Sequence, residues 1–567
     1  STPIKSSAAS DVYKRQLKYI LLSCVVLGAV ACDDFLVETP DTSVEKSGVY
    51  NSLSSAKAAL AGCYGNMAGY NGYAFNYFHV LSVTSGMGVS IKANDVNLTT
   101  MNILPSDVNM TNAYNGMYET VRIANDIIDG MKSSTISIES EKNRIAGEAH
   151  FIRGLTYFNL VRLFGKVSLV TQPVLDYNEA QAPRADVSAV YTLIIDDLKA
   201  AYGMLPLPAD KVEGHPHRYA AQALLAKVYL TLAGNTEGSE YWQKAYDAAK
   251  DVYDHGEYKL VRPYAKLFGS ANKNNAESIF EIQFASAVNS GRLTETTFPV
   301  GHELMSNIAT EGKSWGKTRP SQRAFDQFDE GDPRREASFV YGRYTNIFIA
   351  DAKKKNILLY PTTKKAGTSG TGDNKLVYKQ GDSEYPAWKK YYDPMMTASA
   401  SNANFVYYRY ADLLMVLAEA ANEIGSSDAA GYLNEVLDRA RDADGNGVID
   451  PATEIYPLAV SPEEEADKAL FRERIFRERL KELTGECDEW YTIRRRGTEY
   501  LRKIMEEHNT QVEAWYAAQK LDPANVKFVY MYKITDETVK KNLLMPFPAD
   551  EIIRNENISQ EEQNYGY

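Results

Sequence analysis

The chain has 567 residues, 44% hydrophobic and 24% charged, and its 62 Lys and Arg against 74 Asp and Glu give a formal net charge of −12. These values are typical of a folded globular protein and exclude a disordered or collagen-like chain. The acidic balance, without a block of basic residues, argues against nucleic-acid binding, which needs a face rich in Lys and Arg.

The first 31 residues are not expected to belong to the folded protein. Residues 6–16 resemble the translation of a sequencing-library adapter, so residues 1–16 are left out of the fold and the natural protein is expected to begin near Leu17. Residues 17–31 contain one Lys and then an uncharged, mostly apolar stretch that is shorter than the roughly 20 residues needed to cross a bilayer. This pattern is typical of a secretion signal.

Cys32 directly follows this stretch. With the small residues Ala29 and Ala31 before it, the junction resembles a bacterial lipobox, in which the Cys becomes the lipidated first residue, although Ala29 stands where Leu is more usual. Asp33 and Asp34 resemble the acidic export tag of surface lipoproteins in some Gram-negative bacteria. A plain secretory signal with an incidental Cys remains the alternative.

Two further cysteines remain after this junction. Cys63 and Cys487 lie far apart in the sequence. Two free buried thiols are expected, and a disulfide between them is the alternative. The number and spacing of the cysteines indicate neither a disulfide scaffold nor a zinc site.

Helical periodicity dominates the rest of the chain. Apolar residues recur at i, i+3 or i+4 and i+7 over residues 114–131, 148–164, 191–202, 219–232, 241–254, 410–424 and 429–441. The predicted helices come in pairs with small residues where neighbours meet, which is similar to tetratricopeptide hairpins, although the spacing is too irregular for a regular repeat.

Three long polar stretches rich in Gly and Tyr interrupt the helices, at about 65–112, 286–318 and 345–404. Loops of this length in a compact protein are usually functional or mobile. We therefore predict one mainly α domain over residues 32–567, a tetratricopeptide-like superhelix of helical hairpins with long irregular, partly β insertions.

Catalytic signatures are absent from the sequence. It contains no GxSxG, HExxH or P-loop motif and no dinucleotide-binding fingerprint after a strand, and its seven His do not show metal-ligand spacing. We expect a protein that is not an enzyme and requires no cofactor.

Six segments, taken in order, carry a family resemblance. They are CDDFLVETP at 32–40, EAHFIRGLTYFNLVRLFGKVSLV at 148–170, AFDQFDEGDPRR at 324–335, YRYADLLMVLAEAANEIG at 408–425, ERIFRERLKELTGECDEWYTIRRRG at 473–497 and LLMPFPADEIIRNENISQEEQNYGY at 543–567. Together they resemble the SusD/RagB family of nutrient-binding outer-membrane lipoproteins. One departure is that the family's Glu-Gly-x-Arg-Trp pattern has Cys487 in place of Gly and Glu489 in place of Arg.

The resemblance implies a function. It predicts a lipoprotein anchored by its lipid to the outer membrane and facing outward, which captures an oligosaccharide and acts as the lid of a SusC-like TonB-dependent transporter. A peptide-binding member of the same family and a protein-binding helical-repeat scaffold remain the alternatives.

Most of the quoted motifs are interpreted as structural. Arg334, Arg335, Arg409 and the Arg/Glu-rich run at 472–496 are expected to form ion-paired helix contacts, and Trp242 and Trp490 to lie in the core.

We expect ligand contacts on the loops instead. Sugar rings stack on aromatic planes and their hydroxyls need polar partners, and the loops carry both kinds of side chain. Tyrosine suits such surfaces, and the chain has 39 Tyr against 19 Phe. The candidates are Tyr70, Tyr73 and Tyr77 as a stacking platform, Asn94, Asp95 and Asn97 as polar partners, Trp315 between two glycines, and, as a weaker candidate, Trp388. The alternative for each is ordinary loop packing.

A last motif resembles an EF-hand calcium loop. The candidate ligands are Asp442, Asp444, Asn446, Val448 (through its carbonyl) and Asp450, with Gly447 at the sharp turn. Thr453 stands at position 12, where a bidentate Glu belongs, and Glu454 follows one residue late. We expect a structural Ca²⁺ site, with a solvated acidic turn as the alternative.

Overall fold

The computed structural model describes residues 46–567 except 175, 177–180, 289–290, 300, 305–313, 352, 360–366, 370, 372–374, 379–383, 395, 397–399 and 520–528. The chain divides into two compact units, residues 1–49 and residues 50–567. The first contributes helix α2 (Lys46–Val49). The adapter-like segment, the predicted signal and Cys32 lie outside the described residues.

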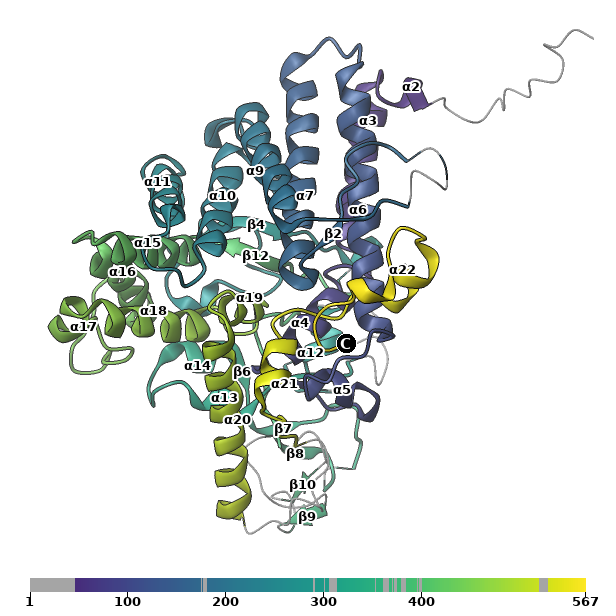
Figure 1. Ribbon diagram of the computed structural model, residues 1–567. Coiled ribbons are helices and arrows are strands. Elements are labelled where there is room, and N and C mark those ends of the chain that lie inside the picture. Colours follow the sequence, from purple (N-terminus) through teal and green to yellow (C-terminus); the bar gives the residue numbers. More distant parts are fainter. Residues whose placement is uncertain are drawn as a thin grey trace, which may run out of the picture. The chain divides into compact units, whose positions relative to one another are not determined.

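Helices make up most of the second unit (Figure 1). They are α3 (Leu53–Met67), α4 (Asn76–Thr84), α5 (Val96–Thr99), α6 (Val108–Lys132), α7 (Glu139–Phe164), α9 (Val187–Met204), α10 (Arg218–Ala233), α11 (Glu240–His255), α12 (Leu293–Thr297), α13 (Gln322–Asp326), α14 (Pro333–Ser338), α15 (Tyr410–Ile424), α16 (Ala429–Arg441), α17 (Pro462–Ala466), α18 (Lys468–Glu482), α19 (Asp488–Arg494), α20 (Thr498–Gln519), α21 (Asp536–Lys541) and α22 (Ala549–Arg554). Successive helices pack in the order α6, α7, α9, α10, α11, α15 and α16. Every helix predicted from periodicity is present, which confirms the mainly α fold.

Local chemistry explains where these helices begin and end. Helix α6 begins after Asp107, whose carboxylate accepts hydrogen bonds from the amides of Asn109 and Met110 at 3.0 and 2.9 Å. Helix α15 ends at Gly425, which takes a φ of 76° in the left-handed region.

Trp242 and Trp490 are buried, as predicted.

Short strands join the helices. They are β1 (Gly88–Ser90), β2 (Val167–Ser168), β3 (Arg184–Ala185), β4 (Ser278–Ile282), β5 (Thr318–Pro320), β6 (Phe339–Val340), β7 (Gly342–Thr345), β8 (Asn356–Leu359), β9 (Gly367–Ser369), β10 (Leu376–Tyr378), β11 (Ala387–Trp388) and β12 (Phe405–Arg409). The order β7–β8–β10–β9 forms one sheet, and β1–β5, β2–β3, β4–β12 and β6–β11 form antiparallel pairs. The predicted β content of the 345–404 insertion is thereby confirmed.

The insertion predicted at 65–112 contains more helix than expected, with strand β1 and irregular segments between the helices. It contains α4, α5, the 3₁₀ turn Ala93–Asp95 and the beginning of α6. All nine residues of α4 are buried. Because no face of this helix meets solvent, its sequence lacks the apolar–polar alternation by which surface helices are detected.

A buried ion-pair network joins the elements of the C-terminal half. Arg334, which is fully buried, pairs with Asp332 and Glu478. Arg409 pairs with Glu482 at 2.7 Å, and Arg334 also reaches Glu482 at 3.3 Å. The predicted ion-paired role of these arginines is confirmed.

The two remaining cysteines are free and buried, which confirms the expectation for both. Cys487, at the position where the family pattern has Gly, takes a φ of 66° in the left-handed region that favours glycine. Glu489, where the pattern has Arg, accepts a hydrogen bond from the amide of Gly485, and burial raises the pKa of Glu489 to about 7. The local fold therefore accommodates both departures.

Candidate functional site

The structure separates the three tyrosines predicted to form a stacking platform. Tyr73 and Tyr77 are buried, the former bonded through its hydroxyl to Asn159 Nδ2 at 2.7 Å and the latter to the hydroxyl of Tyr491 at 2.8 Å. Burial raises the pKa of both phenols well above its usual value. The prediction that Tyr73 and Tyr77 contact a ligand is therefore wrong. Their hydroxyls form hydrogen bonds inside the protein, which allows both aromatic rings to be buried in the core.

Tyr70 and Trp315, in contrast, are exposed. Their exposed fractions are 43% and 39%. Trp388, the weaker candidate, is 1% exposed and packs on Phe339, so it is a core residue and not a ligand contact. Exposed aromatic side chains of this size are candidates for ligand contacts when polar groups surround them.

Contacts through Lys317 connect the two exposed rings. The ring of Tyr70 stacks on Phe75, with centroids 4.7 Å apart. The ammonium of Lys317 lies 3.9 Å from the centroid of the Phe75 ring and 5.9 Å from that of Trp315. Phe75 and Lys317 therefore bridge the two segments that carry the exposed aromatics.

A second connection runs through Glu295 on α12. Its carbonyl accepts hydrogen bonds from the amides of Trp315 and Gly316 at 2.6 and 3.1 Å. Its carboxylate accepts one from Arg292 Nη1 at 3.0 Å, and the guanidinium of Arg292 lies 5.6 Å from the centroid of the Tyr70 ring.

These contacts close a ring of six residues, which we term the Tyr70–Trp315 site. Its members are Tyr70, Phe75, Lys317, Trp315, Glu295 and Arg292.

A buried polar network supports the site from below. His79 stacks on Phe75 at 5.2 Å, and its ring nitrogens lie 2.8 Å from Thr318 Oγ1 and 3.1 Å from Asp95 Oδ2. Burial lowers the pKa of His79, which favours a neutral ring that donates to Asp95 and accepts from Thr318. Ser90 donates a further hydrogen bond to Asp95 at 2.7 Å.

The predicted polar partners lie next to this network. The β1–β5 pairing and a hydrogen bond from the amide of Ile91 to the carbonyl of Lys317 bring residues 91–97 beside Lys317. Asn94 is exposed and Asn97 half-buried. Asp95 is buried; burial raises its pKa, but its bonds to His79 and Ser90 outweigh this and lower the pKa overall. Asp95 therefore supports the site from inside, which corrects its assignment as a ligand contact.

Sequence reasoning missed Arg292 and Lys317. Lys317 carries a weak signal, since it follows the Trp315-Gly316 pair that was singled out, but Arg292 lies in a stretch without any recognisable motif. Their contacts with Tyr70 and Phe75 are tertiary and leave no local signal.

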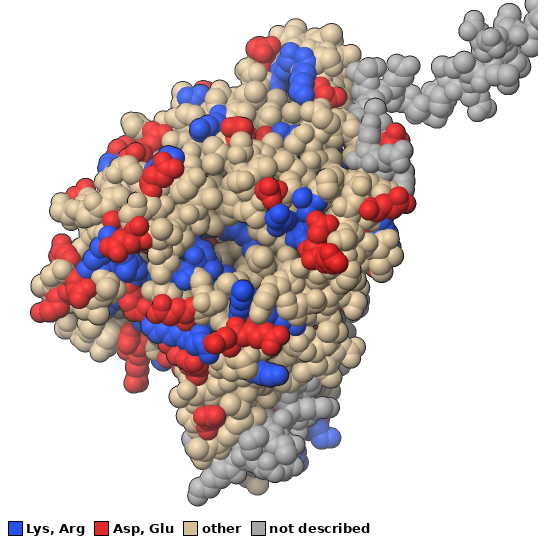
Figure 2. All heavy atoms as spheres, in the orientation of Figure 1, with Lys and Arg blue, Asp and Glu red and all other residues tan. Residues whose placement is uncertain are grey.

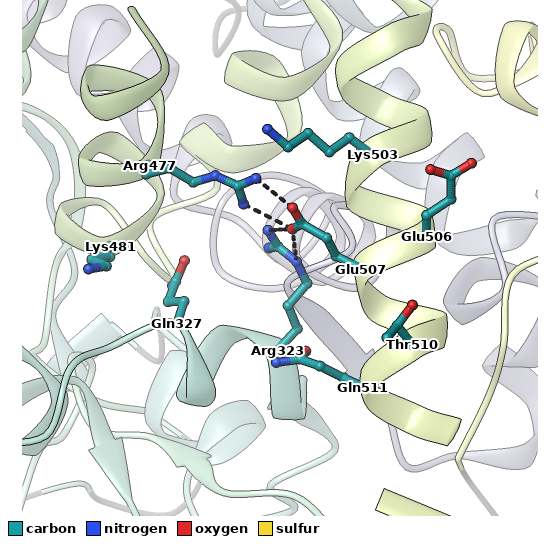
Figure 3. Close-up of a pocket in the computed structure, with 9 residues that line it drawn as sticks. All are labelled: Arg323, Gln327, Arg477, Lys481, Lys503, Glu506, Glu507, Thr510 and Gln511. Atoms are coloured by element: carbon teal, nitrogen blue, oxygen red, sulfur yellow. Dashed lines mark hydrogen bonds and ion pairs between the residues drawn. The ribbon is translucent and has the colours of Figure 1, made fainter. Parts of the chain in front are cut away.

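A separate cavity lies between α13, α18 and α20 (Figure 3). It measures about 570 Å³. Figure 3 shows Arg323 and Arg477 pointing at Glu507. Arg323 Nη2 lies 2.6 Å from Glu507 Oε2, and Arg477 Nη2 lies 2.5 Å from Glu507 Oε1. On the face drawn in Figure 2, acidic and basic side chains are likewise intermixed.

The predicted calcium loop brings three carboxylates together. Oxygens of Asp442, Asp444 and Glu454 lie within 4.8 Å of one another. Asp442 is fully buried; its Oδ2 accepts from Arg262 Nη1 at 2.6 Å and from the Gly447 amide at 3.0 Å, whereas its Oδ1 has no hydrogen-bond partner among the described residues. Carboxylate oxygens of this kind are the ligands that Ca²⁺ prefers.

The other candidate ligands make local contacts. Asn446 Oδ1 accepts from the amide of Val448, and the side chain of Val448 is 70% exposed. The carboxylate of Asp450 accepts from the Ala452 amide and the Thr453 hydroxyl. Glu454, one residue later than the motif requires, does reach Asp442 and Asp444.

The scaffold of paired helices thus presents two exposed aromatic side chains, Tyr70 and Trp315, with polar groups beside them. The SusD family profile matches residues 276–567, and the profile described as "Starch-binding associating with outer membrane" matches residues 34–230. The chain belongs to the SusD family, as the resemblance predicted.

Relatives and solved structures agree with this assignment. The SusD-like protein P2 of Formosa agariphila is 26% identical over 97% of this chain and its own full length, and a SusD-like protein of Bacteroides ovatus is 26% identical over 76% of this chain and 77% of its own. The crystal structure of a SusD homologue from Bacteroides thetaiotaomicron has a TM-score of 0.73 at 21% identity and covers 93% of this chain and 99% of its own. A laminarin-binding SusD-like protein has a TM-score of 0.63 at 23% identity, over 91% of this chain and 99% of its own.

Among the residues that the structure describes, no helix combines the length and apolar character that crossing a bilayer requires.

Proposed function

We propose that this protein is a non-catalytic, cell-surface binding protein that captures an oligosaccharide at the Tyr70–Trp315 site. One observation carries the proposal. The exposed side chains of Tyr70 and Trp315 come from distant segments, and a continuous set of contacts holds them together with hydrogen-bonding groups beside them. Membership of the SusD family and the similarity to a laminarin-binding structure support a carbohydrate as the ligand.

The proposal extends to the cell surface. We propose lipidation at Cys32, an outward-facing position on the outer membrane, and transfer of the captured glycan to a SusC-like TonB-dependent transporter for which this protein is the lid. A multiply acylated Cys anchors a protein stably, whereas one acyl chain binds a membrane only marginally. A lid has to release what it holds, so an open site of modest affinity suits this role.

Affinity electrophoresis of the purified protein, in gels that contain neutral and acidic polysaccharides, tests the binding function. Trp315→Ala is expected to weaken binding about thirtyfold, or about 2 kcal/mol, the loss typical of a central aromatic contact. Tyr565→Ala removes a more exposed tyrosine whose ring contacts Lys540 instead, and is expected to leave binding unchanged.

The alternatives are outcomes of parallel measurements. Binding of a peptide digest in place of every glycan refutes the glycan proposal in favour of the peptide-binding alternative. Co-purification with other proteins but never with a transporter favours the scaffold alternative.

We further propose that Asp442, Asp444 and Glu454 hold a structural Ca²⁺. The burial of Asp442 with an unpartnered Oδ1 beside two other carboxylates supports this site, because a buried carboxylate oxygen without a hydrogen bond is costly unless a cation meets it. Arg262 and the Gly447 amide occupy only Oδ2.

A further inference from the structure

Lys317 is a half-buried cation at the centre of the Tyr70–Trp315 site. Its ammonium lies against the ring faces of Phe75 and Trp315 and has no hydrogen-bond or ion-pair partner among the residues that the structure describes. Cation–π contacts of this kind attract a cation but leave its N–H donors free. Lys317 is therefore placed to donate to something outside the protein.

Arg292 provides a second cation on the Tyr70 side of the site. Its side chain is 25% exposed and makes one hydrogen bond, from Nη1 to Glu295. A guanidinium has five N–H donors in a rigid fork that fits carboxylate and sulfate oxygens. Most of the donors of Arg292 are not used within the described part of the chain.

The acidic groups near the site are already engaged. Asp95 accepts from His79 and Ser90, and the Glu295 carboxylate accepts from Arg292. Lys92, which is exposed, adds a third positive charge close enough to lower the pKa of Lys317, together with the larger effect of burial. The outward-facing charge of the site is therefore positive, although the chain as a whole carries −12.

The cavity in Figure 3 shows the opposite arrangement. There, Arg323 and Arg477 both pair with Glu507, and Lys503 pairs with Glu473 at 2.7 Å. Lys317, which has no carboxylate partner among the described residues, thus differs from the paired basic side chains of this cavity.

We infer that the Tyr70–Trp315 site takes an acidic glycan, whose carboxylate or sulfate groups bind Lys317 and Arg292 while its sugar rings stack on Tyr70 and Trp315. This inference rests on the proposed glycan-binding function and specifies its substrate class. A neutral sugar offers hydroxyls to the two cations, whereas an anionic group forms charge-assisted hydrogen bonds, which are roughly twice as strong.

The test begins with an array of neutral polysaccharides (starch, laminarin, galactomannan), uronate polysaccharides (polygalacturonate, alginate) and sulfated polysaccharides (carrageenan, chondroitin sulfate). The full-length protein is expected to bind an acidic polysaccharide, and the uronate and sulfated sets distinguish the two anionic groups. Binding is expected to weaken between 50 and 300 mM NaCl, because salt screens the attraction.

Titration calorimetry with oligosaccharides of the bound polysaccharide then locates the contact. Lys317→Met keeps the apolar stem and is expected to lower affinity about tenfold, the usual worth of one charge-assisted bond. Lys317→Arg is expected to retain most of the affinity, and Lys199→Met, at an exposed position of α9, all of it. Circular dichroism and the thermal midpoint verify that each variant is folded.

The outcomes separate this inference from the proposed function. If only neutral polysaccharides bind, and Trp315→Ala abolishes their binding, the inference is overturned and glycan capture stands. If an acidic polysaccharide binds equally well to the wild type and to Lys317→Met and Arg292→Met, the inference is overturned as well. If no polysaccharide binds, glycan capture fails and the inference fails with it.

Discussion

Glu482 lies at the centre of the buried ion-pair network, and Glu482→Gln tests how much that network stabilises the fold. The Glu482 carboxylate is fully buried and pairs with Arg334, Arg409 and Arg439, which come from α14, β12 and α16. Glutamine preserves the size of the side chain and removes its charge. The substitution therefore leaves three buried guanidinium groups with less negative charge to meet them.

The size of the effect follows from the pKa of Glu482. Burial alone raises this pKa, but the three arginines outweigh burial and lower it from 4.5 to about 2. At roughly 1.4 kcal/mol per pH unit, the native contacts favour the ionised carboxylate by about 3 kcal/mol. Removing one partner of a buried ion pair typically costs about 3–5 kcal/mol, so Glu482→Gln is expected to lower the free energy of unfolding by a similar amount.

The same argument gives a pH dependence. A carboxylate with a lowered pKa in the folded state contributes its stability in full above its unfolded pKa, near 4.5, and loses it as the pH falls toward 2. The urea midpoint of the wild type should therefore decrease over this range, and that of Glu482→Gln should decrease less.

Urea denaturation followed by circular dichroism measures both effects. The matched control is Glu240→Gln, which removes an exposed carboxylate that pairs with Lys244 and is expected to change stability by about 0.5 kcal/mol or less. If Glu482→Gln shifts the midpoint no more than Glu240→Gln does, the stabilising role of the network is refuted.

Three more predictions concern calcium, the binding site and the anchor. With Ca²⁺ at about 100 times its Kd, the free energy of unfolding is expected to rise by about 2.7 kcal/mol, which scanning calorimetry with CaCl₂, MgCl₂ or EGTA measures. The calcium site is contradicted if the wild type unfolds at the same temperature in CaCl₂ and in EGTA. It is also contradicted if Asp444→Ala keeps the calcium-induced shift of the unfolding temperature. Tyr77→Phe removes a buried hydroxyl that bonds to Tyr491, so it is expected to lower the free energy of unfolding by about 1 kcal/mol and to leave glycan affinity unchanged. Tyr70→Ala is expected to weaken glycan binding and to leave the free energy of unfolding unchanged. A Tyr70→Ala variant that binds normally but is less stable argues against the assignment of Tyr70 to the site. Cys32→Ser is expected to move the protein from the membrane fraction to the soluble fraction, as judged by immunoblotting, and its retention in the membrane rules out Cys32 as the anchor.

Helices whose sequence keeps a periodic apolar–polar contrast were predictable. The predicted ranges 410–424 and 429–441 coincide with α15 and α16 at both ends. Helix α15 is almost completely buried, but it keeps this contrast because its polar residues Asp412, Glu419 and Glu423 form buried ion pairs. Helix α4 escaped prediction because it has only nine residues and no such contrast.

The binding site was predictable only in part. Trp315, between two glycines and outside any amphipathic pattern, was rightly expected on the surface, as was Tyr70. Tyr73 and Tyr77 belong to the same sequence stretch as Tyr70, and only the fold reveals that their hydroxyls find partners in the core. Arg292 meets Tyr70, and Lys317 meets Phe75, through contacts between segments far apart in the chain, which local sequence does not encode.

The hydrogen bond from the amide of Trp315 to the carbonyl of Glu295 has a consequence for how this protein diversifies. It fixes two residues that lie twenty positions apart in the chain, so the backbone is held together here whatever the length of chain between them. The entropy of closing a loop grows slowly, by about 0.6 kcal/mol for each doubling of its length. Insertions that leave the buried residues of this stretch in place (Thr296, Thr297, Phe298, His302 and Ser314) are therefore expected to cost little in folding free energy, and the helical hairpins can stay as they are.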